Sequence, residues 1–210
     1  MIFKLYNKLF KSAYNFSIFK TFMYNLFIFK TIKPKLYLGK KTSIINRGGI
    51  IKVYEKSYFD CKNSGQFFYD SHIVLENNSK LILGKNVNFF GGTQIKCFEN
   101  AQISIGNGTY FSGPITIHSK KKISIGKNCS ISWGVTIIDS DFHSIGENEI
   151  KSEEVIIEDN VWIGCNVTIL KGSYIPSGSI IAAKTVVTKP LNRKGVYAGN
   201  PARLIRELDE

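Results

Sequence analysis

The sequence lacks the features that mark zinc, redox and membrane-spanning proteins. It has four widely spaced cysteines, Cys61, Cys97, Cys129 and Cys165, and no CxxC pair that would indicate a zinc or redox motif. We therefore expect four reduced thiols. In the N-terminal segment the longest uncharged run is nine residues, 21–29, which is too short to span a bilayer. The segment also has no continuous apolar core followed by a small-residue cleavage site, so we expect no secretory signal.

Acidic residues are absent from the first 54 positions, which contain eleven Lys and Arg. Subtracting these eleven charges from the net charge of +12 leaves only +1 for the rest of the chain, so we expect no nucleic-acid partner. The first thirty residues also hold ten aromatic residues. We expect residues 1–35 to form an amphipathic helical segment. It either touches an anionic membrane surface through residues 1–32 or caps the fold or an oligomer contact.

A period of 3.6 residues, which amphipathic helices need, is absent from residues 81–190. Bulky apolar residues recur there mostly every sixth position instead. Each hexad then forms one short strand and a corner, three hexads form one coil, and stacked coils share an apolar interior. The fifteen positions of this pattern are Leu83, Phe89, Ile95, Ile105, Phe111, Ile117, Ile125, Ile131, Ile137, Ile157, Ile163, Ile169, Ile175, Ile181 and Val187.

The pattern predicts an all-β fold, a parallel β-helix over residues 36–190, followed by a C-terminal segment, 191–210. A second local pattern, apolar-x-apolar-Gly, ends at Gly84, Gly106, Gly126 and Gly164. We expect these glycines at the corners, where a positive φ is often needed.

The six-residue repeat has one long interruption within residues 81–190, a loop at residues 138–156. An extruded loop in a regular solenoid is where function is expected. The loop contains His143, preceded by Asp139 and Asp141. A histidine with a nearby aspartate is the minimum general-base unit, and the sequence does not decide which aspartate would orient the ring. His118 is interpreted as a solvated side chain.

Four stretches, residues 131–143, 161–172, 182–189 and 198–206, resemble the hexapeptide-repeat acyltransferases. The chain is most similar to the branch that O-acetylates cell-surface polysaccharides. The resemblance implies a left-handed parallel β-helix, a short C-terminal helix and a homotrimer with sites between subunits. It also implies acetyl-CoA as co-substrate, no metal, and a place in the bacterial cytoplasm, with the inner face of the cytoplasmic membrane as an alternative.

The resemblance also implies roles for individual positions. His143 matches the general base that deprotonates the acceptor hydroxyl, which then attacks the acetyl thioester directly, with no acyl-enzyme. Trp162 matches an acceptor-lining residue, and Trp133 is either part of the acceptor wall or a corner side chain. The positions implied to bind acetyl-CoA, from the pantetheine arm to the nucleotide phosphates, are Cys165, Ala183, Lys184, Thr188, Lys189, Arg203 and Arg206.

Two positions depart from the family pattern. Ser144 follows the histidine where many free-sugar acetyltransferases have Pro, and Lys184 stands where Gly is common. The main alternative function is that of an amino-sugar N-acetyltransferase. Less favoured are a γ-type carbonic anhydrase, which needs three zinc-binding histidines, and a non-catalytic β-helical protein.

Overall fold

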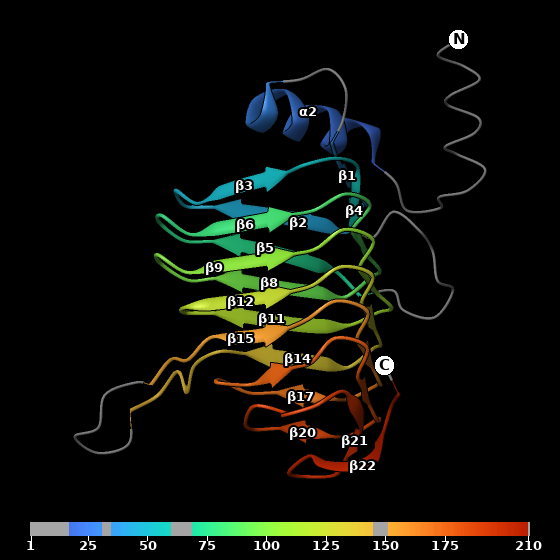
Figure 1. The fold of residues 1–210 in the computed structure, drawn as a ribbon. Coiled ribbons are helices and arrows are strands. Elements are labelled where there is room, and N and C mark those ends of the chain that lie inside the picture. The colour runs from blue at the N-terminus through green and yellow to red at the C-terminus, as the bar shows by residue number, and fades with distance from the viewer. Residues whose placement is uncertain (1–16, 31–34, 60–68, 145–150, 210) are drawn as a thin grey trace, which may run out of the picture.

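The computed structural model describes residues 17–30, 35–59, 69–144 and 151–209. Within them the chain winds as a three-sided solenoid, with one helix at its N-terminal end (Figure 1). Strands that are three apart along the chain pair in parallel, so each sheet collects one side of every coil. The expected all-β parallel β-helix is therefore confirmed, and the three parallel sheets are consistent with a left-handed β-helix.

The three sheets differ in the number of described strands. The nine-stranded sheet contains β1 (Leu36–Leu38), β4 (Ser57–Phe59), β7 (Asn88–Phe89), β10 (Tyr110–Phe111), β13 (Ser130–Ile131), β16 (Trp162–Ile163), β19 (Ile180–Ile181), β21 (Gly195–Ala198) and β22 (Arg203–Glu207). The seven-stranded sheet contains β2 (Thr42–Asn46), β5 (Ser71–Leu75), β8 (Thr93–Cys97), β11 (Ile115–Ser119), β14 (Val135–Ile138), β17 (Thr168–Ile169) and β20 (Val186–Val187). The six-stranded sheet contains β3 (Ile50–Val53), β6 (Lys80–Leu83), β9 (Gln102–Ile105), β12 (Lys122–Ile125), β15 (Val155–Ile157) and β18 (Tyr174–Ile175).

The apolar hexad positions form the interior of the solenoid. All fifteen positions of the sequence pattern are buried, with exposed fractions of 4% or less. Strands alternate buried and partly buried residues because successive side chains point to opposite faces of a sheet. Phe59, Phe89 and Phe111 stack in one column, with ring centroids 4.1 and 4.5 Å apart. No coil could bury such a row by itself, so the stacking of coils provides the stability.

The predicted role of the corner glycines is wrong. None of Gly84, Gly106, Gly126 and Gly164 has a positive φ. Glycine is required at these positions because the coils stack closely. A Cβ on Gly106 would lie 2.5 Å from the carbonyl carbon of Gly126 in the next coil. The left-handed backbone falls two residues later, at Asn86, Gly108, Asn128 and Asn166.

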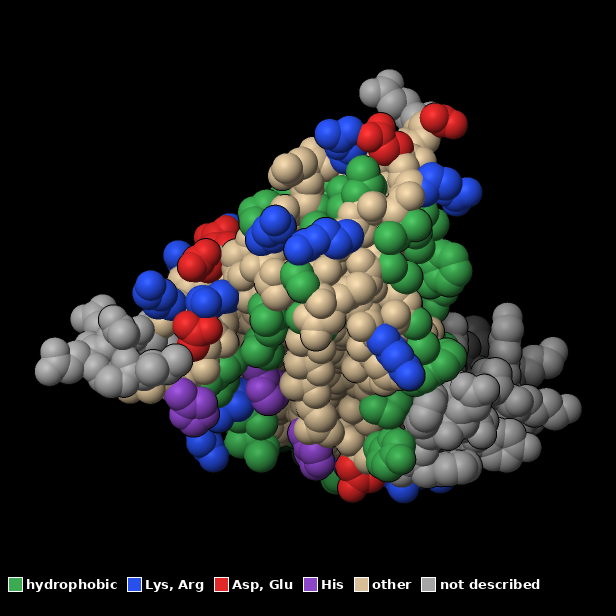
Figure 2. Space-filling view, turned by 90° about the horizontal axis from the view of Figure 1, so that it is seen from below, with side chains coloured by type: hydrophobic (Ala, Val, Ile, Leu, Met, Phe, Trp, Pro, Cys, Tyr) green, Lys and Arg blue, Asp and Glu red, His purple; other side chains and the backbone are tan. Residues whose placement is uncertain are grey.

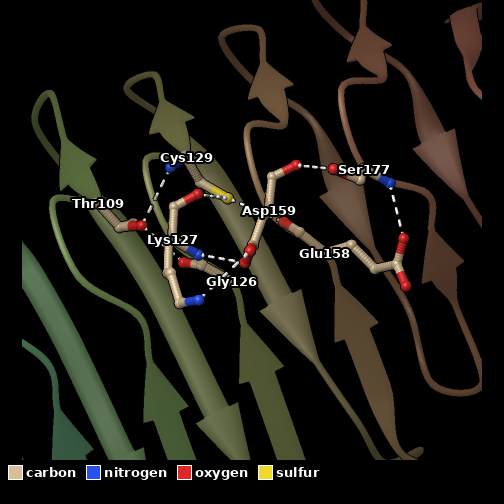
Figure 3. A network of polar contacts seen from close by, with 7 residues as sticks. All are labelled: Thr109, Gly126, Lys127, Cys129, Glu158, Asp159 and Ser177. Atoms are coloured by element: carbon tan, nitrogen blue, oxygen red, sulfur yellow. Dashed lines mark hydrogen bonds and ion pairs between the residues drawn. The ribbon is translucent and has the colours of Figure 1, made fainter. Parts of the chain in front are cut away.

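Polar side chains fasten neighbouring coils at one corner (Figure 3). The backbone N–H of Lys127 donates to Asp159 Oδ1 at 2.7 Å, and the N–H of Ser177 donates to Glu158 Oε2 at 2.8 Å. The Cys129 thiol is buried at the same corner and donates to the Glu158 carbonyl at 3.1 Å. Burial raises the pKa of the Cys129 thiol above its usual value, so this cysteine is an unreactive corner residue.

The C-terminal helix expected from the resemblance is wrong. Residues 203–207 form β22, which pairs antiparallel with β21. Five residues are too short for a helix to be stable by itself, whereas a strand here satisfies the free backbone groups along the edge of β21. At the other end, α2 (Ile18–Phe29) confirms the N-terminal helix. Residues 1–16, also expected to be helical, lie outside the described residues.

Candidate active site

The loop that interrupts the repeat leaves the solenoid where β14 ends and returns at β15 (Figure 1). Its two arms are held together at the base by a β-bridge between Ser140 and Ser152, whose hydroxyls lie 3.0 Å apart. The N–H of Asp141 donates to the Lys151 carbonyl at 3.1 Å. Residues 145–150 lie outside the described part of the chain. These bonds give the loop a fixed origin on the solenoid.

Asp139 anchors the start of the loop to the preceding coil. It is fully buried, and its carboxylate accepts hydrogen bonds from the Ser119 hydroxyl at 2.6 Å and from the N–H groups of Lys120 and Lys121 at 2.7 and 2.9 Å. All three donors belong to the preceding coil. These bonds tie the Asp139 carboxylate to the β11–β12 corner.

His143 lies just beyond the clamped base of the loop, and its side chain is exposed. Asp141, two residues earlier, is also exposed and forms an ion pair with Lys171, with Nζ 2.9 Å from Oδ1. The residue after the histidine, Ser144, is exposed as well. A solvent-facing imidazole on an anchored loop can reach a ligand that approaches from outside the coil.

Phe142, next to His143, has φ = 60°, a left-handed backbone that a bulky residue rarely adopts. Its ring contacts the outer face of the seven-stranded sheet. The ring centroids of Phe98 and Phe142 are 5.3 Å apart, and Lys120 Nζ lies 5.3 Å from the Phe142 centroid. The strained Phe142 thus places an aromatic ring at the base of the loop, one residue before His143.

His118 also belongs to this face, and its interpretation as a solvated side chain is wrong. It is half-buried and lies edge-on to Phe142, with ring centroids 6.3 Å apart. Burial, and after it the charge of Lys96, lower the pKa of His118 below 6.5. The histidine side chains gather on one side of the molecule (Figure 2).

Sequence reasoning missed the hollow on this face. It has a volume of about 330 Å³ and is lined by Glu76, Phe98, Glu99, Lys120 and Ser152. The residues come from three coils and from the loop, so nothing in their spacing along the chain connects them. The available signal was an outward aromatic residue, Phe98, directly after a strand.

Three of the residues implied to bind substrates share a corner at the start of β14. The Trp133 carbonyl accepts the N–H of Asn166, and the Cys165 carbonyl accepts the N–H of Lys184, each at 2.9 Å. Trp133, Cys165 and Ala183 therefore stack as one column over three coils. We call these three residues the corner column. The loop leaves from the other end of β14, which has four residues, so roughly 13 Å of strand separates the two features.

Two further predicted residues lie beside the corner column. Trp162 points outward from β16, where its indole is 56% exposed, between Ser130 of β13 and Ile180 of β19. Lys184 is exposed and has φ = 60°. This left-handed backbone gives a physical reason for glycine at the position in the family pattern.

The basic residues predicted for the nucleotide end are exposed near the C-terminal end of the solenoid. Lys189 and Arg203 line one hollow of about 280 Å³, together with Arg193 and Tyr197. Thr188 precedes this hollow, and Arg206 lies opposite Val196 in the β21–β22 pair. Lys and Arg side chains are spread over this end of the molecule (Figure 2). Guanidinium and ammonium groups so placed suit phosphate ligands.

Among the described residues, no group of three or more His, Cys, Asp or Glu side chains is arranged to hold a metal ion. Cys97, Cys129 and Cys165 are free thiols, and Cys61 lies outside the described residues.

The chain is similar to known transferases with hexapeptide repeats. The bacterial transferase hexapeptide model (six repeats) matches residues 154–189. A galactoside O-acetyltransferase of Escherichia coli is 35% identical over 52% of this chain and 56% of its own length. A polysialic acid O-acetyltransferase of Neisseria meningitidis is 34% identical over 49% of this chain and 57% of its own length.

The chain thus spans little more than half the length of these curated relatives. One solved structure, a polysialic acid O-acetyltransferase, shares more of the fold. It is 25% identical, with a TM-score of 0.50, and the match covers 79% of this chain and 88% of that chain.

Proposed function

We propose that this chain, which belongs to the hexapeptide-repeat acetyltransferase family, transfers the acetyl group of acetyl-CoA to a sugar hydroxyl of a cell-surface polysaccharide or its precursor. The observation that carries the proposal is the exposed His143 on a clamped loop, in the long interruption of the hexads between β14 and β15. Relatives named for galactoside and polysialic acid O-acetylation support a sugar acceptor.

In this reaction His143 acts as the general base. Its neutral imidazole takes the proton of the acceptor hydroxyl while the hydroxyl oxygen attacks the thioester carbonyl carbon. The tetrahedral intermediate then collapses, the C–S bond breaks, and the imidazolium returns the proton to the departing thiolate. The acetyl group passes directly to the sugar. A base in position contributes about 10²–10⁴-fold to the rate of such a step.

We infer that Asp141, rather than Asp139, orients His143. The Asp139 carboxylate is directed to the preceding coil by three hydrogen bonds. Asp141 is exposed beside the loop base, and its described partner, Lys171, leaves one carboxylate oxygen for an imidazole N–H. Asp139 acts on catalysis only through the position of the loop.

Acetyl-CoA as substrate would follow the corner column and then turn toward the C-terminal end. Cys165 is partly exposed and Ala183 is exposed, and their small side chains leave room for the pantetheine arm. Trp162 and Trp133 are exposed beside it and can wall the acceptor. Lys189, Arg203 and Arg206 would meet the nucleotide phosphates, with Thr188 and Lys184 alongside.

We propose a homotrimer with its sites between subunits. Within one subunit the corner column and the His143 loop lie at opposite ends of β14. Three copies side by side around a threefold axis bring the loop of one copy to the column of the next. Mixing two inactive variants tests this arrangement. Randomly assembled trimers of His143→Ala and Ala183→Trp should recover about a quarter of wild-type activity, whereas a site within one subunit would recover none.

The proposed reaction is tested by thiol release from acetyl-CoA with a panel of sugar acceptors. We expect acceptor-dependent release, and His143→Ala should lower kcat/KM by at least about 10²-fold because the base is gone. The matched control is His72→Ala, which removes an exposed histidine of β5, in the seven-stranded sheet, and should change the rate less than about twofold. Full activity of His143→Ala would contradict the base assignment. Acetylation of amino sugars alone would favour the N-acetyltransferase.

We place the reaction in the cytoplasm. The free thiols Cys97, Cys129 and Cys165 fit a reducing compartment. Mass spectrometry of purified protein with an alkylating reagent, under denaturing conditions, should label all of them.

A further inference from the structure

The side of α2 that faces the solenoid combines both kinds of residue: Tyr24, Ile28 and Phe29 pack against the core, beside two buried polar side chains. Asn25 and Thr21 are buried, although most of their neighbours in the helix are apolar. The Asn25 amide donates to the Leu36 carbonyl at 2.6 Å and accepts from the N–H groups of Lys35 and Leu36 at 2.7 and 3.1 Å. The Thr21 hydroxyl accepts from the N–H of Leu38 at 3.0 Å. These bonds satisfy backbone groups along the edge of β1, which is the first strand of the nine-stranded sheet.

Two more side chains of α2 bond to the next side of the first coil. Lys20 Nζ donates to the carbonyls of Lys40 and Thr42 at 2.6 and 3.0 Å, and the Tyr24 hydroxyl donates to the Ile44 carbonyl at 3.0 Å. An open sheet edge presents unpaired backbone groups and invites association with another chain. The polar residues of α2 are therefore used in closing the end of the solenoid.

The opposite side of α2 is apolar and faces outward. Phe19 and Phe27 are 74% and 70% exposed, and Ile18, Phe22 and Leu26 are exposed beside them. A surface helix of a soluble protein ordinarily turns its large apolar residues inward, whereas α2 exposes these five. Three apolar residues of the first coil, Ile45, Ile50 and Tyr54, are exposed as well. These eight residues form what we call the N-terminal face, at the end of the solenoid that α2 covers (Figure 1).

Cations outnumber acids around the N-terminal face, where Glu55, next to Tyr54, pairs with Lys85 and Asp70 pairs with Lys41. Residues 1–54 contain no Asp or Glu, and Lys30, Lys35, Lys40, Arg47 and Lys52 are exposed there. A second copy of the chain docked on this face would bring lysines against lysines, which is unfavourable. An anionic lipid surface meets both properties, because headgroups attract the cations and the interface accepts aromatic rings.

We propose that the N-terminal face binds an anionic lipid bilayer, with α2 lying in the plane of the headgroups. Among the described residues, no helix has the length and apolarity to cross a bilayer, so the contact is peripheral. In this arrangement the solenoid extends away from the membrane, with its N-terminal end against the bilayer. This inference depends only on α2 and the first coil, so it holds even if the proposed transferase activity fails.

The test is sedimentation of the full-length protein with vesicles. Wild type should bind vesicles of phosphatidylcholine with phosphatidylglycerol and should release as salt is raised to about 0.5 M. The double variant Phe19→Ser with Phe27→Ser should lower the partition coefficient by at least about tenfold. Both rings are mostly exposed, so the fold and thermal midpoint should be unchanged. The control, Tyr110→Ser with Ile205→Ser, removes exposed apolar groups away from this face and should bind as wild type.

Three outcomes would overturn the proposal. They are wild-type protein that stays in the supernatant with anionic vesicles, equal loss in the control, and salt-independent binding to phosphatidylcholine alone. A fourth such outcome is measured by light scattering of the protein without lipid. Concentration-dependent association that the Phe19→Ser and Phe27→Ser variant abolishes would assign the face to a second copy of the chain.

Discussion

Asp139 and Asp141 are both carboxylates close to His143 in the sequence, yet they serve different purposes. One is buried with three donors, and the other is exposed with one cation. A carboxylate buried with several hydrogen bonds is costly to remove because its donors lose their acceptor, whereas an exposed ion pair contributes little to stability. The two residues are therefore a natural pair for separating structure from catalysis.

We expect Asp139→Ala to lower the free energy of unfolding by about 3 kcal/mol, because three donors at the β11–β12 corner are left without an acceptor. Asp141→Ala should cost less than about 1 kcal/mol and yet lower kcat/KM at least about tenfold. Urea denaturation and the thiol-release assay measure the two effects. A stable but inactive Asp139→Ala protein would reverse the assignment.

His118 and Lys96 give a pH prediction. Burial and then Lys96 lower the pKa of His118 in the folded state, so the unfolded chain takes up the proton first. This histidine therefore reduces stability as pH falls below about 6.5, and the loss is complete below its folded-state pKa. We expect Lys96→Met to raise the pKa of His118 part of the way toward 6.5 and to shrink that acid-induced loss.

An NMR titration of the His118 ring measures this shift. Lys85→Met is the matched control, because Lys85 pairs with Glu55 near another corner of the solenoid and should leave the titration unchanged. If Lys96→Met does not change the pKa of His118, burial alone lowers that pKa.

At the scale of structural elements, each corner joins two positions with different requirements. The first, as at Gly106, needs the absence of a side chain because the next coil passes within 3 Å of where a Cβ would be. The second, as at Gly108 with φ = 72°, needs a left-handed backbone, which Asn128 and Asn160 adopt at equivalent places. The repeating unit therefore uses glycine for two separate reasons.

Substitutions at these two positions distinguish the reasons. Gly106→Ala should lower the free energy of unfolding by about 1–3 kcal/mol, because backbone atoms of the next coil must move. Gly108→Asn should cost less than about 1 kcal/mol, because asparagine tolerates the left-handed region and the nearest atom is the tip of the Asn128 side chain. Thermal or urea denaturation of both variants checks the order. Equal losses would contradict it.

At the scale of the whole molecule, the solenoid has two ends that need covering. The antiparallel pair of β21 and β22 completes the C-terminal end of the nine-stranded sheet, and α2 covers the N-terminal end with side-chain hydrogen bonds. The division of the chain into residues 1–35, 36–190 and 191–210 stays a prediction. A solenoid unfolds locally from its ends because each coil contacts only its neighbours.

We therefore expect Asn25→Ala to act on the first coil alone. Loss of the amide removes the partners of both backbone groups of Leu36, so amide exchange at Leu36 and Leu38 should accelerate by at least about tenfold. Exchange in β9 and β12 should not change. Hydrogen exchange read by mass spectrometry or NMR measures both regions. Uniform acceleration throughout the solenoid would show that the coils unfold as one unit.

The hexad by itself determined the class of the fold and its interior. A side chain that recurs every sixth residue can share one apolar interior only if the backbone turns a corner within each repeat. That is a local constraint, so all fifteen positions were predictable and are buried. The interruption at residues 138–156 likewise indicated the loop with His143, because the break in the period is a feature of the sequence alone.

Tertiary structure decided the features that depend on residues far apart in the sequence. Asp139 received its partners from the preceding coil, Phe98 and Phe142 met across the base of the loop, and residues 203–207 became a strand because β21 had a free edge. The buried polar residues of α2 were likewise selected by the open backbone of β1. Periodicity records which side chains point inward. It does not record which backbone groups the stacked coils leave unpaired, and those groups determined the ends, the loop anchor and the outward face of the helix.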